Sequence, residues 1–391
     1  MSSTQHRFDV AIVGCGLVGL AAALALAQQG LRIALIGPAE KSSEQDWDSR
    51  IYALNPGNQA WLDALRVWGE VDILRCAPVY DMRIFGAETA AAALHFSAYQ
   101  ARLGQLAWIV ENRELLRVLR LGCRMQSNLQ TFPVQAHALG VSDAQATLTL
   151  ADGKTIGAAL IVGADGANSW VRQQACIATQ ERDYHQTAVV ANFQCSAAHL
   201  DTAYQWFRDD GVLALLPLPG QRVSMVWSAH QETAQTLQQI SADALCEKVA
   251  QAAQGKLGTL ELITPPAAFP LRLRQAASMT APRVALIGDA AHVIHPLAGQ
   301  GMNLGLQDAH DLAQVIAARE AFRDCGDARV LARYARARAE DVLLMRTVTD
   351  GLQRLFGTDD PIAQKLRKEG MACLDKLPFL KSALIRHAAG Q

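Results

Sequence analysis

The chain of 391 residues lacks most features that mark a specialised class of protein. None of its eight cysteines has another close by, so we expect free thiols of a reducing cytoplasm instead of disulfides or a metal cage. The 36 Lys and Arg nearly balance the 37 Asp and Glu, and a formal charge of −1 gives no reason to expect nucleic acid as a partner. No internal repeat or low-complexity linker divides the chain.

Long apolar runs are also scarce. The stretch 10–27 is apolar enough to resemble a signal peptide or a membrane span. Its glycine spacing, a weak basic flank of His6 and Arg7, and the absence of a small-residue cleavage site favour a buried strand and helix instead. A hydrophobic fraction of 50% with 19% charged residues is typical of a soluble globular protein, and the length allows two or three domains.

A complete βαβ pattern is present near the start of the chain. It predicts a strand, a helix and a second strand at 8–13, 17–29 and 31–36. Gly14, Gly16 and Gly19 then fall at the turn from strand to helix. Gly14 permits the tight turn, Gly16 lets the backbone approach a pyrophosphate, and Gly19 lets helix and strand pack closely. Because a helix N-terminus also offers free N–H groups, the pattern predicts a dinucleotide site.

One expected part of that site is missing. An acidic residue normally ends the second strand and hydrogen-bonds the adenosine ribose, but Gly37 occupies its place. Glu40 follows three residues later. Either Glu40 reaches the ribose from the loop or it is a solvated loop charge, and the sequence leaves both readings open.

Two more glycine-centred motifs lie further along the chain. The middle one reads Asp165-Gly166-Ala167-Asn168-Ser169 and is followed by Arg172, and the last runs from Gly288-Asp289-Ala290-Ala291-His292 through Pro296 to Gly299-Gln300-Gly301. In this order and at this spacing the three motifs predict one flavin site. A reductase with separate flavin and nicotinamide domains would show a second Gly-x-Gly-x-x-Gly, so we expect the reductant to bind only transiently.

Further strands follow from apolar, β-branched runs. They are predicted at 106–110, 146–150, 159–163, 187–194, 212–218, 222–227 and 284–287, and helices dominate from Leu304. The predicted fold is α/β, with a discontinuous Rossmann-like FAD-binding domain (1–75, 100–179 and 282–345). An inserted sheet-rich substrate domain (76–99 and 180–281) would cover the flavin ring, and 346–391 would form a C-terminal helical segment.

The three motifs resemble those of the class A FAD-dependent aromatic monooxygenases, which have the p-hydroxybenzoate hydroxylase fold, over essentially the whole chain. Several other strings resemble the ubiquinone-biosynthesis hydroxylases within that group. These strings are Asp48-Ser49-Arg50, Val110-Glu111-Asn112-Arg113, Leu215-Leu216-Pro217-Leu218 and the unbroken run 295–305. The last of them is the most family-specific.

The resemblance implies roles for the last motif. Asp289, after Gly288, would accept a hydrogen bond from a ribityl hydroxyl of FAD. Backbone N–H groups of Gly299, Gln300, Gly301 and Met302, with Asn303 beside them, would lie under the flavin pyrimidine and stabilise negative charge there. Pro296 would lie beside the flavin peroxide, or it is only a turn proline. His292 and His295 have a spacing that can suggest metal ligands, but no further His or Cys cluster accompanies them, so we expect no metal.

Charged residues outside that motif are also implied as contacts. Arg50 would meet the FAD phosphates or the flavin edge, with Arg113 in the same field, unless these are ordinary surface arginines. Asp165, Gly166 and Arg172 would serve both FAD and the passing nicotinamide cofactor NAD(P)H.

The middle domain should carry substrate specificity, because flat aromatic walls suit a quinol-like ring and apolar walls suit a prenyl tail. The candidate pocket residues are Tyr184, His185, Asn192, Trp206, Phe207, Pro217 and Trp227. Residues of these types in a sheet domain are also common core residues. No residue stands out as a general base.

The resemblance implies a monooxygenase that hydroxylates the ring of a polyprenyl phenol or quinol in ubiquinone biosynthesis, with NAD(P)H and O2, through a flavin C(4a)-hydroperoxide. Hydroxylation of a small soluble phenol, or a non-catalytic subunit of a biosynthetic complex, stays open. The segment 352–391 mixes basic and apolar residues, so it either packs as a helical hairpin or rests on anionic lipid or a partner. We expect a cytoplasmic protein; contact with the inner membrane or a biosynthetic complex, and homodimer formation, stay open.

Overall fold

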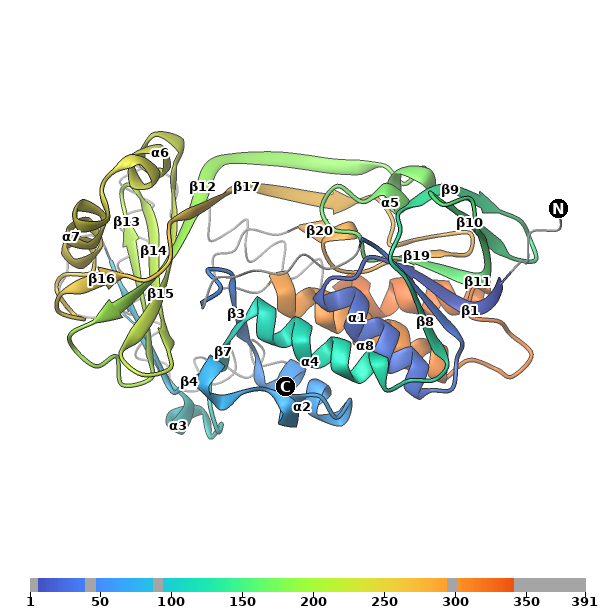
Figure 1. The fold of residues 1–391 in the computed structure, drawn as a ribbon, viewed down its shortest axis with the longest axis horizontal. Coiled ribbons are helices and arrows are strands. Elements are labelled where there is room, and N and C mark those ends of the chain that lie inside the picture. Colours follow the sequence, from blue (N-terminus) through green and yellow to red (C-terminus); the bar gives the residue numbers. More distant parts are fainter. Residues whose placement is uncertain (1–5, 39–46, 87–93, 294–300, 341–391) are drawn as a thin grey trace.

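The computed structural model describes residues 6–38, 47–86, 94–293 and 301–340. Two large sheets lie at opposite ends of the molecule, and the long strands β12 (Thr179–Cys195) and β17 (Ala267–Ala276) reach from one end to the other (Figure 1). The first βαβ unit is confirmed as β1 (His6–Val13), α1 (Leu17–Gln28) and β2 (Ile33–Ile36).

The eight-stranded sheet draws its strands from distant parts of the chain. Its main path runs β18 (Thr280–Ala281), β19 (Val284–Leu286), β11 (Thr155–Gly163), β1, β2 and β8 (Leu129–Phe132). β10 (Ala146–Leu150) pairs with β11 and with β9 (Ala136–Val141). Four neighbouring pairs on this path are parallel: β19 with β11, β11 with β1, β1 with β2, and β2 with β8. The carboxyl ends of β1, β11 and β19 therefore meet at one edge of the sheet.

The nine-stranded sheet is mainly antiparallel. Its path runs β20 (His292–Val293), β17, β12, β15 (Arg222–His230), β14 (Gly211–Leu218), β13 (Thr202–Arg208), β5 (Asp81–Phe85) and β6 (Leu94–Ser97), and β16 (Leu260–Leu262) pairs with β12. The predicted strands 187–194, 212–218 and 222–227 are confirmed within it. Helices α6 (Gln231–Gln239) and α7 (Ala242–Ala252) cover its outer face (Figure 1).

A small third sheet joins β3 (Ile51–Leu54), β7 (Ala107–Glu111) and β4 (Cys76–Val79). The remaining helical elements are α2 (Pro56–Ala64), α3 (Ala98–Ala101), α4 (Asn112–Arg124), α5 (Trp170–Gln174), α8 (Gly301–Ala317), the 3-10 turns η1 (Trp68–Glu70), η2 (Ile73–Arg75) and η3 (Gly288–Ala290), and a helical stretch at 328–340.

Helix α1 forms the centre of the first core. It packs against α4 and α8, and ten of its residues are buried. A helix that is apolar on all sides must be covered on all sides, which explains its position beneath the sheet. Among the described residues, no helix is long and apolar enough to cross a membrane.

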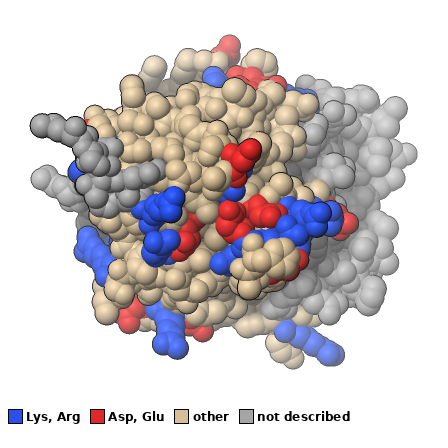
Figure 2. Space-filling view, turned by 90° about the vertical axis from the view of Figure 1, so that its right-hand side faces the viewer, with Lys and Arg blue, Asp and Glu red and all other residues tan. Residues whose placement is uncertain are grey.

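Charges of both signs are interspersed on the face shown in Figure 2. Ion pairs join Arg283 with Asp324 at 3.0 Å and Arg323 with Asp327 at 2.8 Å. Among the described residues of this face, the two signs of charge alternate and no extended region of one sign is visible.

Candidate active site

At the turn from β1 to α1, one glycine has free space beside its Cα atom, and the other two are tightly packed against backbone. A Cβ on Gly14, whose φ is +124°, would lie 2.1 Å from the carbonyl oxygen of Ala164, and one on Gly19 would lie 2.1 Å from the carbonyl oxygen of Gly14. Gly16 has nothing within 4 Å of the Cβ position. It precedes a helix that has no side-chain cap and no acidic residue in its first turn. These features fit an anionic pyrophosphate at the N-terminus of α1.

Gly37 is buried beside the same turn. A Cβ there would lie 2.7 Å from Sγ of Cys15, the residue between the first two glycines of the motif. The thiol therefore occupies the space that a side chain at position 37 would need. Burial also raises the pKa of Cys15, which keeps this thiol neutral.

The second motif packs directly against the first through Ala164. The Asp165 carboxylate accepts hydrogen bonds from the Ser169 hydroxyl and, at 3.0 Å, from the Val171 N–H. Arg172 is buried and donates to the carbonyl oxygens of Ala290 at 2.7 Å and Ala167 at 2.8 Å. Burial and the nearby Arg274 lower its pKa. In this structure Asp165 stabilises the second motif itself, and Arg172 holds that motif against the third. Contact of either residue with a cofactor stays a prediction.

The third motif is held by a buried ionic network. Asp308 of α8 accepts the Gly288 N–H at 2.8 Å, and its carboxylate lies 2.6 Å from Nε2 of His292. Arg338, from the helical stretch 328–340, donates to Asp308 at 2.7 Å and to Asp311 at 2.9 Å. Asp308 and Arg338 are fully buried, so their opposite charges must neutralise each other. His292 thus has a carboxylate partner, and the described residues contain no His, Cys, Asp and Glu cluster suited to a metal ion.

Asp289 lies at the turn that this network fixes. Its side chain meets solvent, yet surrounding protein desolvates it enough to raise its pKa, while His292 and Arg50 partly oppose the shift. Arg50 lies next to β3, with its guanidinium 5.3 Å from the centre of the Phe269 ring. The positive charge of Arg50 thus acts on Asp289, and contact of either side chain with FAD stays a prediction.

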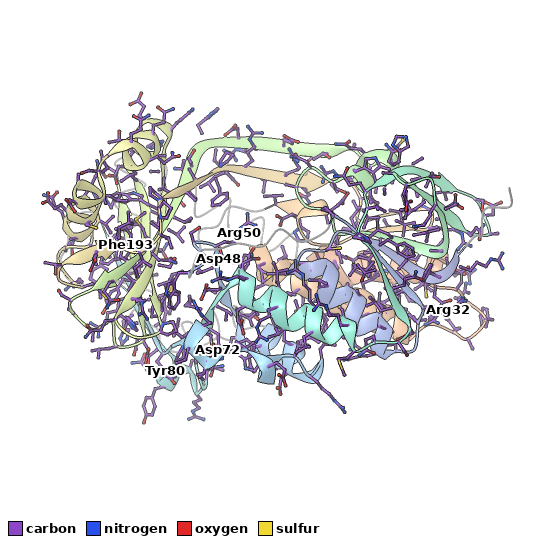
Figure 3. All side chains as sticks on the ribbon, in the orientation of Figure 1. Arg32, Asp48, Arg50, Asp72, Tyr80 and Phe193 are labelled. Atoms are coloured by element: carbon purple, nitrogen blue, oxygen red, sulfur yellow. The ribbon has the colours of Figure 1, made fainter. Side chains whose placement is uncertain are left out.

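Asp48 connects Arg50 with two other parts of the molecule. One carboxylate oxygen accepts the Arg50 N–H at 2.9 Å and the other accepts the Arg113 N–H at 3.1 Å. Its carbonyl oxygen accepts from the side chain of Asn192, on β12, at 3.0 Å. Asp48 and Arg50 lie together between the two large sheets (Figure 3).

Buried Glu111 supports the same segment. It accepts the Asp48 N–H at 2.8 Å, and its carboxylate lies 3.3 Å from Arg75 and 3.4 Å from Arg113. Burial raises the pKa of Glu111, and the hydrogen bond and both arginines oppose that shift. Arg113 is thus occupied with Glu111 and Asp48, and its contact with FAD stays a prediction.

Helix α8 begins at Gly301, and Asn303 fixes its first turn. The Asn303 side chain accepts the Asn55 N–H at 2.9 Å and donates to the Ala53 carbonyl at 2.7 Å. Met302 is partly buried against the core around α1. Asn303 therefore ties the start of α8 to the connection between β3 and α2, and the N-terminus of α8 contains no acidic residue that would repel a negatively charged ring.

The predicted pocket residues divide between the two faces of the nine-stranded sheet. Trp206 and Trp227 pack in the core beneath α6 and α7, and Pro217 lies on the same face by alternation along β14. The geometry favours a core role for these three residues. Asn192 and Phe207 alternate onto the opposite face, where Asn192 meets Asp48.

The remaining pocket candidates lie at a bulge of β12. His185 is highly exposed there, with a φ of +54°, between the register positions Asp183 and Gln186. Its neighbour Tyr184 is buried. Glu40, Pro296, Gly299 and Gln300 lie outside the described residues, as does the C-terminal segment 346–391.

The sequence did not reveal the residues that hold the predicted site residues in place. Asp48 and Glu111 stood within the family-like strings without an assigned role, and Asp308 and Arg338 were not singled out. Asp308 falls at helical spacing with the apolar residues Leu304 and Leu312, and a charge on that face is the one signal that could have indicated a buried pair. Their partners on other elements lie from 16 to 144 residues away along the chain, and spacing along the chain does not reveal them.

Comparison with known proteins agrees with this geometry. The chain is 34% identical to the ubiquinone hydroxylase UbiL of Rhodospirillum rubrum, over 99% of this chain and 91% of that protein. It is also 34% identical to the 3-demethoxyubiquinol 3-hydroxylase of Escherichia coli, over 99% and 100%. The human mitochondrial ubiquinone biosynthesis monooxygenase COQ6 is 30% identical over 99% and 94%.

Solved structures share the fold at lower identity. The p-nitrophenol 4-monooxygenase PnpA of Pseudomonas putida superposes with a TM-score of 0.79 at 19% identity, covering 98% of each chain. PqsL of Pseudomonas aeruginosa, a probable FAD-dependent monooxygenase, gives 0.77 at 22%, covering 94% of this chain and 99% of that one. The family model described as FAD binding domain matches residues 7–345, and the chain therefore belongs to this family of FAD-binding monooxygenases.

Proposed function

We propose that the protein is an FAD-dependent monooxygenase that hydroxylates the aromatic ring of a polyprenyl phenol or quinol during ubiquinone biosynthesis. NAD(P)H is the proposed transient reductant and O2 the oxidant. The observation that carries the proposal is the open Gly16 turn, which lies at the same edge of the sheet as the turn that carries Asp289, in a chain that matches named ubiquinone hydroxylases over nearly its full length.

The residues present fit FAD. The uncapped N-terminus of α1, open at Gly16, would hold the pyrophosphate. Asp289, kept in place through Asp308, would accept from a ribityl hydroxyl, and Arg50 would supply positive charge beside it. Bound FAD supplies the oxygen-activating chemistry, which no amino-acid side chain provides.

The remaining residues orient and shield the reacting ring. Backbone N–H groups from 299–302 would stabilise negative charge on the cofactor, since they precede and open α8. The face of the nine-stranded sheet that carries Asn192 and Phe207 would cover the aromatic ring of the substrate. A protein that encloses the ring in this way limits loss of the activated oxygen to water.

A second candidate function is hydroxylation of a small soluble phenol, because PnpA, which shares the fold, is named for p-nitrophenol. A cytoplasmic location, with or without contact to the inner membrane, suits either candidate. A non-catalytic role is disfavoured by the relatives, which are named as hydroxylases and monooxygenases.

The decisive experiment compares two substrates on purified, FAD-loaded protein. Oxygen uptake driven by NADH or NADPH is followed with a short-chain prenyl phenol and with p-nitrophenol, and products are identified by mass spectrometry. We expect a hydroxylated prenyl phenol and little p-nitrophenol turnover. Turnover of p-nitrophenol alone would contradict the proposal.

We also predict that Pro296→Ala keeps FAD but releases more hydrogen peroxide per NAD(P)H consumed.

A further inference from the structure

We propose that one exposed end of the nine-stranded sheet docks the protein on the lipid–water interface of a bilayer. This docking tip consists of Tyr80, Tyr99 and Leu200, whose exposed fractions are 44%, 90% and 78%. Three large apolar side chains that project from one place are unusual on a soluble surface. Tyr80 lies at the lower edge of the molecule in Figure 3.

Backbone hydrogen bonds hold the three segments of the docking tip together. The Ala98 N–H donates to the carbonyl of Tyr80 at 2.8 Å, which places α3 and Tyr99 beside the link between β4 and β5. The Tyr80 N–H donates to the carbonyl of Asp201 at 3.0 Å, which adds the turn that carries Leu200. The docking tip is therefore formed by three segments that are distant in the chain and joined by backbone hydrogen bonds.

The turn that displays Leu200 is strained. Leu200 and Asp201 have φ values of +53° and +51°, and the Thr202 N–H closes the turn on the carbonyl of His199 at 3.1 Å. Two consecutive left-handed residues with side chains are disfavoured. Buried His199 enforces the turn, because its Nδ1 accepts the Asp201 N–H at 3.0 Å and its Nε2 lies 2.8 Å from the Gly220 carbonyl. Strain that presents a leucine to water indicates a partner for that leucine.

The side-chain types favour lipid as that partner. Tyrosine rings are enriched at the level of lipid headgroups, where one end of the ring is apolar and the other meets water. Exposed Arg83 and Arg102 flank the docking tip and can reach headgroup phosphates along their flexible stems. Two acids lie at its base: Asp81 pairs with His95 at 2.6 Å, and the Asp201 carboxylate lies 3.9 Å from Nδ1 of buried His199. Side chains that protrude from three segments suit a fluid interface better than a rigid complementary protein surface.

The docking tip also lies at the end of an apolar layer that leads toward the candidate active site. Val79 and Met82 flank Tyr80 and belong to one cluster with Ile51 and Leu216. Ile51 directly follows Arg50 in the chain. This inference rests on the proposed function, because a polyprenyl substrate is dissolved in the bilayer to which the docking tip would attach.

Vesicle sedimentation tests the inference on the full-length FAD-loaded protein. The vesicles contain phosphatidylethanolamine and phosphatidylglycerol, and the test variant is Tyr99→Ser with Leu200→Asn. Asparagine tolerates a left-handed backbone, so this variant should fold at least as well as the parent. The control is Phe322→Ser, which removes another side chain of 80% exposure beside Arg323, away from the docking tip. We expect the double variant to bind at least about fivefold more weakly, and the control to change by less than about twofold.

Equal sedimentation of the double variant and the parent would overturn the inference. A second measurement separates this inference from the proposed function. Hydroxylation of a polyprenyl phenol supplied in vesicles should fall in the double variant, while hydroxylation of a short-chain soluble analogue should not change. The double variant could bind vesicles more weakly while neither it nor the parent hydroxylates either substrate. That result would support the docking tip and contradict the proposed function.

Discussion

At the scale of single residues, Cys15 and Gly37 act as a complementary pair. A side chain at 37 would collide with the Cys15 thiol, because its Cβ would lie 2.7 Å from Sγ. In the dinucleotide-binding motif an acid normally ends this strand and binds the ribose, and here the Cys15 thiol takes the space that such a side chain would need. The missing acid and the cysteine in the glycine motif have one steric explanation.

We predict that restoring the acid requires both positions to change. Gly37→Glu alone should weaken FAD binding or leave it unchanged, because the new side chain displaces Cys15. Gly37→Glu with Cys15→Ala should tighten it by a few-fold to about tenfold, since partial exposure reduces the gain from ribose hydrogen bonds. FAD titration of the apo proteins measures this. Glu40→Ala is the companion variant: weaker binding there, with no gain in the double variant, would show that Glu40 already meets the ribose.

Asp289 should be required for cofactor affinity. We predict that Asp289→Ala gives folded protein that binds FAD about ten- to hundredfold more weakly, because it loses a charge-assisted hydrogen bond of about 1.5 to 3 kcal/mol. Flavin absorbance after gel filtration and fluorescence titration of apo protein measure the effect. Normal flavin occupancy would show that Asp289 does not bind the cofactor.

The same carboxylate should destabilise the empty protein at neutral pH. Burial raises the pKa of Asp289, so the folded state holds its proton more tightly than the unfolded chain. The charged carboxylate lowers the stability of the folded state. This loss of stability is absent when the pH is below the pKa of Asp289 in the unfolded chain, about 4, and it grows as the pH rises through the higher pKa of the folded state. Asp289→Asn should therefore raise the Tm of apo protein at pH 8 but not near pH 4. Asp143→Asn, on an exposed turn, is the control, and an equal gain at both pH values would refute this explanation.

At the scale of elements, α8 joins the candidate active site to the helical stretch 328–340. Asp308 holds the Gly288 turn on one side and Arg338 on the other. Tyr334, also buried, donates to the Leu286 carbonyl at 2.9 Å, just before that turn. The stretch 328–340 therefore supports the third motif although it has no direct contact with Asp289 among the interactions described.

Arg338→Met should be strongly destabilising. It leaves Asp308 buried without a countercharge, for which about 3 to 5 kcal/mol of unfolding free energy is the usual loss. We expect a lower Tm and weaker FAD binding, because the Gly288 turn loses its fixed anchor, and Arg338→Lys should recover part of both. Arg336→Met, exposed on the same helical stretch, is the matched control. Wild-type FAD affinity in Arg338→Met would show that the network does not position the turn.

The elements nearest the glycine motifs were predictable, and the network behind them was not. β1, α1 and β2 follow from apolar periodicity and the glycine spacing, because both depend on neighbours along the chain. Trp206 and Trp227 show the limit, since aromatic residues in a strand suit a pocket and a core equally well until the covering helices are placed. The pairing of Asp308 with Arg338 depends on two helical segments packing together, and no local pattern specifies it.

At the scale of the whole molecule, Asn192 connects the nine-stranded sheet to the segment that carries Arg50. Its side chain donates to the Asp48 carbonyl, 144 residues away in the chain. We predict that Asn192→Ala lowers the Tm, since it removes a part-buried hydrogen bond worth about 0.5 to 1.5 kcal/mol, and raises the peroxide released per NAD(P)H. Gln194→Ala, two residues along on the same face, is the control. Unchanged coupling in Asn192→Ala would show that the sheet and the Arg50 segment act independently.

The length of β12 limits how the molecule can move. Its 17 residues span about 55 Å at about 3.3 Å per residue, so one strand is anchored in both halves. A continuous strand resists bending where its ladder is intact, and the ladder with β17 is interrupted between Asp183 and Gln186. The ladder is weakest at this bulge, where His185 has its left-handed backbone. If one half rotates against the other, β12 would bend most easily there, because elsewhere its hydrogen bonds to neighbouring strands resist bending.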